Sequence, residues 1–128
     1  CLVGSEMCIR DSIKAAGEEV QDMKLVYICS PYRAADEATL QRNIDYAREL
    51  TQMVLTKWGE AAVTPHLYMT QCLNEADEAE RQCGLAAGQA IVEKCEIMLV
   101  GRRFGISEGM AGEIKRAREK GICILHHD

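Results

Sequence analysis

The chain has 128 residues, which is the usual size of one domain. Hydrophobic residues make up 48% and charged residues 27%, as in ordinary soluble globular proteins, and no run of about 18 apolar residues is present that could span a membrane. The net charge of −5 argues against a protein that coats a nucleic-acid polymer, but it leaves room for one small anionic ligand.

The first twelve residues, CLVGSEMCIRDS, show neither helical nor strand periodicity. They resemble the translation of a transposon-type sequencing adapter in one reading frame, which matches Leu2 to Ser12 in full. We therefore expect residues 1–12 to be an artefact outside the fold. A signal peptide is disfavoured, because a basic start followed by an apolar stretch is lacking. Residues 13–22 are an uncertain tail, and residues 23–128 are the expected domain.

The first half of this domain predicts strand, helix and strand. Residues 24–29 are apolar and β-rich, and Ser30-Pro31 ends them. Residues 37–58 carry an apolar stripe at helical spacing, with Asp36 as N-cap and Gly59 as the stop. Residues 61–64 form a second predicted strand, which Pro65 ends.

The second half continues the alternation. Residues 65–77 predict a loop or short helical turns, and residues 78–95 predict a helix with Leu85, Ile91 and Val92 facing inward. Residues 96–101 are apolar throughout, as in a strand buried on both faces. Residues 108–120 predict a helix between Ser107 as N-cap and Gly121, and residues 122–125 predict a fourth strand. His126 and His127 are expected in a solvated tail.

Strands that alternate with helices predict right-handed βαβ units and a parallel sheet covered on both faces. The expected fold is therefore a small α/β domain of three layers, flavodoxin-like or Rossmann-like, with strand order 2-1-3-4. The odd cysteine count and the lack of a C-x-x-C pair or a zinc spacing predict free, mostly buried thiols and a cytoplasmic location. We expect no metal.

Ligands of such sheets bind beyond the carboxyl ends of the strands, where the strand order reverses. Here that point lies between the first and third strands. Arg33, Arg102 and Arg103 follow these two strands, and a helix N-terminus begins at Ser107, so the pattern favours an anionic group such as phosphate.

Glu113 lies on the second turn of that helix, where the helix dipole favours its ionised form. A carboxylate in a cleft can act as a nucleophile toward a sugar carbon. The alternative is a solvated glutamate paired with Arg116. His66 is a structural or a catalytic histidine, Tyr27 belongs either to the core or to the site, and Tyr32 is the better placed ligand contact. No G-x-G-x-x-G or P-loop motif is present, so we expect no dinucleotide cofactor.

Three segments together resemble a known family: VYICSPYR, then TPHLY with Gln71 following, and CEIMLVG with ISEGMAGEIKRA. They look like small uncharacterised domains of bacteria and phages that are related to nucleoside 2-deoxyribosyltransferases. The resemblance covers about residues 24–125, and the S-x-G-M-x-x-E-I run is its most specific part.

This resemblance implies that Tyr27 with Ser30-Pro31 cups the nucleoside and that Glu113 is the nucleophile. It also implies that Ser107, six residues earlier, contacts phosphate as in family members that hydrolyse deoxynucleoside monophosphates. The remaining expected ligand contacts are Tyr32, Arg33, His66, Gly109 and Met110.

One departure from the family concerns a second carboxylate, an aspartate that assists protonation of the leaving base. The aligned position here is about Gly88. Loss of such an acid costs typically 10²–10⁴-fold in rate. Asp77, Glu80 and His66 are the candidates to replace it.

Two functions follow as hypotheses. The first is an N-glycosidase or 2-deoxyribosyltransferase that acts on a nucleoside or nucleoside monophosphate. The second is a non-catalytic nucleotide-binding or regulatory module of the same fold, and a structural role is the remaining alternative. Base, sugar and phosphate state stay open. The family resemblance also implies a homo-oligomer, with residues 78–95 as a candidate interface.

Overall fold

A four-stranded parallel sheet forms the centre of the structure, a computed structural model that describes residues 22–128. The strands are β1 (Leu25–Cys29), β2 (Ala61–Val63), β3 (Ile97–Gly101) and β4 (Cys123–His127). Their order is β2-β1-β3-β4, and every pairing is parallel, which confirms the predicted sheet. The predictions for residues 1–12 and for most of the tail lie outside the described residues.

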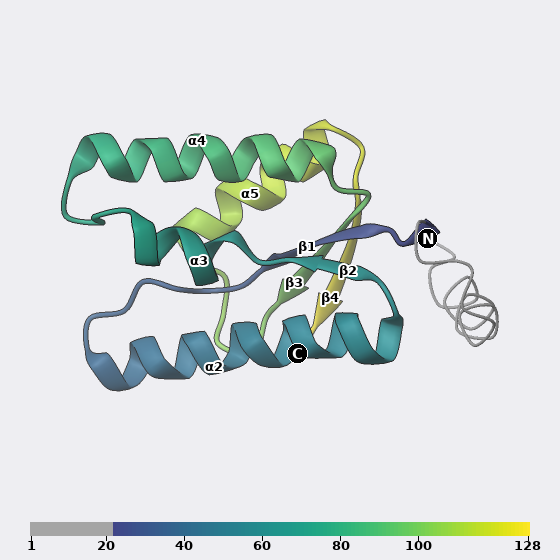
Figure 1. Ribbon diagram of the computed structural model, residues 1–128, viewed down its shortest axis with the longest axis horizontal. Coiled ribbons are helices and arrows are strands. Elements are labelled where there is room, and N and C mark those ends of the chain that lie inside the picture. Colours follow the sequence, from purple (N-terminus) through teal and green to yellow (C-terminus); the bar gives the residue numbers. More distant parts are fainter. Residues whose placement is uncertain (1–21) are drawn as a thin grey trace.

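Helices cover both faces of the sheet (Figure 1). α2 (Glu37–Met53) lies on one face, and α4 (Glu78–Lys94) and α5 (Glu108–Glu119) lie on the other. α3 (Pro65–Cys72) follows β2, and the N-terminal half of α4 extends past the carboxyl ends of the strands (Figure 1). This three-layer arrangement was predicted, and it leaves the carboxyl edge of the sheet surrounded by α3, α4 and the start of α5.

The alternation of side chains along β1 separates two cores. Val26 and Ile28 pack on the α2 side with Leu50. Tyr27 and Cys29 point to the opposite face, where the other core includes residues of α4 and α5. Because successive side chains of a strand face opposite sides, Tyr27 belongs to the layer that carries the α5 helix.

Capping residues set the ends of the helices where the sequence predicted them. The Asp36 side chain accepts a hydrogen bond from the backbone N–H of Thr39 at 2.7 Å. The predicted continuous helix 37–58 instead widens after Met53 into a π-helical turn, η2 (Val54–Trp58). Gly59 ends this turn in a left-handed conformation with φ 68°, which a residue without Cβ adopts at little cost.

Of the two alternatives for residues 65–77, the structure has the helical one: Pro65–Cys72 form a short helix, with Pro65 at its first turn, where a missing N–H is tolerated. Two other predictions about local structure are wrong. His126 and His127 belong to β4, because they pair with the last two residues of β3. Leu85 does not face the core: its side chain is 43% exposed, since the N-terminal half of α4 extends beyond the sheet.

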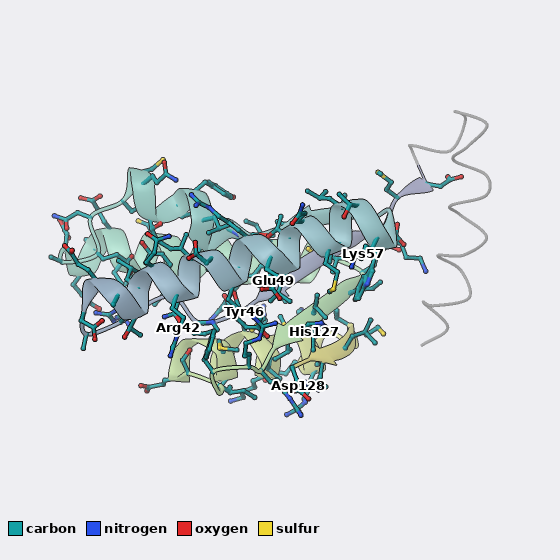
Figure 2. All side chains as sticks on the ribbon, turned by 90° about the horizontal axis from the view of Figure 1, so that it is seen from below. Arg42, Tyr46, Glu49, Lys57, His127 and Asp128 are labelled. Carbon is teal, nitrogen blue, oxygen red and sulfur yellow. The ribbon has the colours of Figure 1, made fainter. Side chains whose placement is uncertain are left out.

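The far side of the sheet from α4 carries a polar cluster around the end of β4 (Figure 2). The Tyr46 hydroxyl donates to the backbone oxygen of His127 at 3.2 Å, which ties β4 to α2. Arg103 donates from both terminal nitrogens to Glu49 at 3.1 and 2.6 Å. Figure 2 shows Tyr46 and Glu49 on α2 beside the strand end.

Two further properties bear on the predictions made from composition. Within residues 22–128, no helix is long and apolar enough to cross a membrane. Cys29 and Cys95 are free and buried, whereas Cys72 and Cys83 are free and exposed. The expectation of mostly buried thiols therefore holds for only half of these four.

Candidate active site

A pocket of about 420 Å³ opens at the carboxyl ends of β1 and β2, within the range typical of small-molecule sites. It lies where the strand order reverses, as the sequence predicted. Residues from the ends of β1 and β2, from α3, from the N-terminal half of α4 and from the start of α5 line it. These are Tyr27, Ser30, Tyr32, Arg33, Pro65, His66, Met69, Thr70, Leu73, Glu75, Arg81, Gly84, Leu85, Gly88, Ser107, Glu108, Gly109, Met110 and Glu113.

Glu113 and Tyr27 form the innermost polar pair of the pocket. The Tyr27 hydroxyl donates to Glu113 Oε2 at 2.6 Å, a short bond of the kind made to a charged acceptor. Tyr27 is buried, and burial together with the neighbouring carboxylate raises the pKa of its phenol. Tyr27 therefore stays neutral and acts as a donor across the physiological range.

The environment of Glu113 corrects two expectations. Burial raises the pKa of its carboxyl, although hydrogen bonds from Tyr27 and Cys29 oppose that rise. The predicted stabilisation of the charged form by the helix N-terminus is thus outweighed by desolvation. Arg116, the proposed alternative partner, instead donates to Glu93 at 2.6 Å, which leaves Glu113 directed at Tyr27 and the pocket.

Gly88 of α4 lies directly beside this pair. A Cβ atom at Gly88 would be 3.5 Å from the Tyr27 hydroxyl and 3.8 Å from Glu113 Oε2. The position that the sequence resemblance assigns to a second carboxylate is therefore adjacent to Glu113, but glycine supplies no side chain there.

His66 and Ser30 form a second polar pair in the pocket. Ser30 Oγ and His66 Nε2 are 2.9 Å apart, and the Tyr32 ring meets the imidazole edge-on, with ring centroids 6.3 Å apart. Burial lowers the pKa of His66 to about 4. At neutral pH His66 is consequently an uncharged hydrogen-bonding group and a poor proton donor.

The start of α5 forms the wall where an anion was expected. Ser107 Oγ accepts from the backbone N–H of Met110 at 3.2 Å. Since a hydroxyl also carries one hydrogen, Ser107 can still donate to a ligand. Arg33 also lines the pocket and is exposed, so a second group suited to an anion is present in the same cavity.

The structure brings together nine of the ten predicted site residues. Pro31 is the exception, because it is buried and does not line the pocket. Arg102 and Arg103 also lie elsewhere: they pair with Asp128 and Glu49.

The candidate replacement acids Asp77 and Glu80 are absent from the pocket lining. The Asp77 side chain caps α4, and Glu80 accepts from the backbone N–H of Asn74 at 3.0 Å. Of the three candidates only His66 reaches the pocket, and it is neutral.

Sequence reasoning missed the wall formed by α3 and α4. Its unexpected members include Glu75, Arg81 and Gly84. The available signal was the glycine pair Gly84 and Gly88, four residues apart on a predicted helix, which indicates a helix face approached closely by another group.

A sequence model for a family described as Domain of unknown function (DUF7768) matches residues 24–127. The chain belongs to this family. No curated protein matches the sequence.

The fold of this DUF7768 domain is shared by solved structures, among them two 2-deoxyribosyltransferases. One is a 2-deoxyribosyltransferase from Bacillus psychrosaccharolyticus, described as a biocatalyst for nucleoside synthesis. It has 14% identity and a TM-score of 0.58, over 80% of this chain and 70% of that one. The other is a 2-deoxyribosyltransferase from Leishmania mexicana, with 16% identity and a TM-score of 0.53, over 80% of this chain and 63% of that one. The predicted relationship of the fold to 2-deoxyribosyltransferases is confirmed.

Proposed function

We propose that this DUF7768 domain cleaves the N-glycosidic bond of a nucleoside or nucleoside monophosphate, as an N-glycosidase or a 2-deoxyribosyltransferase. The observation that carries the proposal is the Tyr27–Glu113 bond of 2.6 Å inside a pocket at the switch point of the sheet. A carboxylate that is held by a neighbouring hydroxyl and lines a ligand-sized pocket is the arrangement that a carboxylate nucleophile needs.

The proposed reaction has two displacement steps. An oxygen of ionised Glu113 attacks the anomeric carbon of the sugar, the bond from that carbon to the base nitrogen breaks, and its electron pair leaves with the base, which takes up a proton. The resulting glycosyl ester is then attacked by water or by a second base, which releases Glu113 and one proton. Tyr27 holds the attacking carboxylate in place, and its hydrogen bond opposes the rise that burial causes in the pKa of Glu113.

The wall of α5 suits a phosphate on the far side of the sugar. Ser107, Gly109 and the first backbone N–H groups of α5 lie there, and Arg33 lines the same pocket. The family resemblance, in which a serine six residues before the glutamate contacts phosphate, favours a monophosphate over an unphosphorylated nucleoside. Tyr32, His66, Ser30 and Met110 complete the proposed ligand contacts.

One observation favours the second candidate function, a non-catalytic nucleotide-binding module. The position beside Glu113 is Gly88, which has no side chain, and His66, with its lowered pKa, is a poor proton donor at pH 7. A pocket that binds the ligand without protonating its base would act as a sensor or regulatory module. For either function we propose a cytoplasmic homo-oligomer that takes a small molecule.

Base release measured by chromatography decides between the two functions. The chain is incubated with deoxy- and ribonucleoside monophosphates, in parallel with Glu113→Gln and with Glu119→Gln, an exposed glutamate at the end of the same helix. Release by the wild type and by Glu119→Gln, but not by Glu113→Gln, supports the glycosidase. Thermal stabilisation by monophosphates without base release supports the binding module.

A further inference from the structure

One stripe of α4 faces the pocket. Arg81, Gly84, Leu85 and Gly88 all line it, and their spacing of three, four and seven residues places them along a single side of the helix. Gly88 is at the inner end, beside Glu113, and Arg81 is at the outer end. Seven residues of helix separate the two by about 10 Å.

The middle of this stripe is shaped for a flat group. At Gly84 and Gly88 the helix backbone itself faces the pocket, since neither residue has a side chain. A Cβ at Gly84 would lie 3.1 Å from the Leu73 side chain, so the helix and α3 already approach closely there. Leu73, Leu85 and Met69 supply apolar surface around this region, which suits the faces of an aromatic ring.

Arg81 has capacity to bind a ligand. Within residues 22–128, its ion-pair partner is Glu78 at 3.8 Å, and the Glu78 side chain is 72% exposed. Such a long contact in water contributes little. By comparison, Arg103 and Arg116 each hold a carboxylate at 2.6 Å. The guanidinium of Arg81 is therefore free to turn toward a pair of acceptors in the pocket.

The position of Glu113 and of the start of α5 indicates where each part of a bound nucleotide would lie in the pocket. If Glu113 meets the anomeric carbon and the start of α5 holds the phosphate, the base must extend along the remaining wall, over Gly88 and Gly84 toward Arg81. Glu75, from the segment between α3 and α4, lines the same pocket and offers an acceptor.

We propose that Arg81 determines which base the site accepts and that it selects a 6-oxopurine such as guanine or hypoxanthine. This inference rests on the proposed function. A 6-oxopurine presents acceptors at O6 and N7, which a guanidinium binds with two parallel hydrogen bonds, next to a donor at N1. Adenine places a donor at position 6 and loses this match.

Titration calorimetry with dGMP and dAMP tests the inference on the full chain. Arg81→Gln removes the guanidinium that would make the two parallel hydrogen bonds. Arg48→Gln, on the exposed side of α2, is the matched control. We expect the wild type and Arg48→Gln to bind dGMP more tightly than dAMP. Arg81→Gln should weaken dGMP binding by at least about tenfold while dAMP binding changes by less than about twofold. Thermal melts of each variant verify folding.

Equal weakening of dGMP and dAMP by Arg81→Gln overturns the inference, because it identifies a phosphate contact. An unchanged ratio, or no binding of either nucleotide to the wild type, overturns it as well. The proposed function is judged separately by base release. A chain that releases base through Glu113, but keeps its dGMP-to-dAMP ratio in Arg81→Gln, retains the function and loses this inference.

Discussion

The substitution Tyr27→Phe tests the innermost pair of the site. It removes only the hydroxyl that donates to Glu113 at 2.6 Å and keeps the ring that fills the core. A hydrogen bond to a charged group is worth about 1.5–3 kcal/mol, so the loss reduces base release at neutral pH by about ten- to a hundredfold. The attacking carboxylate loses the donor that positions it, and the pKa of Glu113 rises further, because burial is then opposed by one donor fewer.

The measurement is the pH profile of kcat/KM for base release. Since only ionised Glu113 attacks, the acidic limb should move to higher pH in Tyr27→Phe, and the deficit should shrink as the pH rises. Tyr68→Phe, which alters an exposed tyrosine of α3 outside the pocket lining, is the control. An acidic limb that stays in place, or a deficit that is equal at every pH, would refute the assigned role of Tyr27.

Four further predictions concern stability. Glu113→Gln should raise the Tm at pH 7. The pKa of Glu113 is raised above its usual 4.5, so its ionisation destabilises the fold as the pH rises. If Glu113→Gln melts at the same temperature as the wild type and the control Glu119→Gln, the charge of Glu113 is not buried. His66 has its pKa lowered from 6.5 to about 4, so the free energy of unfolding should fall by on the order of 3 kcal/mol as the pH drops through this window. His66→Gln should abolish that slope in denaturant titrations, and a slope that persists rules His66 out as its source. Gly88→Ala should be neutral or stabilising by up to about 1 kcal/mol, since its Cβ meets only ordinary contacts. Gly101→Ala should destabilise the fold by about 1–3 kcal/mol, because its Cβ would lie 2.6 Å from the Leu50 side chain. Equal Tm values for Gly88→Ala and Gly101→Ala in thermal melts would contradict both expectations.

The sheet was predictable because its signals are local. Four short apolar runs, each followed by Ser-Pro, Pro, Gly or the chain end, alternate with helices capped at Asp36 and Ser107. Because connections between parallel strands are right-handed and short, only a few topologies are compatible with this order of elements. The strand order in turn placed the switch point, and with it nine of the ten predicted site residues.

The wrong predictions concern residues whose surroundings in the fold differ from what their local sequence pattern indicates. His127 lies in a polar tail by composition, yet β3 offers it a free edge to pair with. Leu85 has an apolar side chain at helical spacing, but its turn of α4 extends beyond the sheet. Arg103 follows a strand in sequence, and Glu49 of α2 draws it away from the pocket.

The sequence by itself determined the strand order and the carboxyl edge of the sheet at which the pocket lies, because periodicity and caps are properties of neighbouring residues. The family resemblance added Glu113 as the expected nucleophile. Only the tertiary structure decided what surrounds that carboxylate. Tyr27 and Glu113 are 86 residues apart, and α4 brings Gly88 and Arg81 to the same pocket. Burial, which raises the pKa of Glu113 and lowers that of His66, depends on packing between distant segments, and no local pattern encodes it.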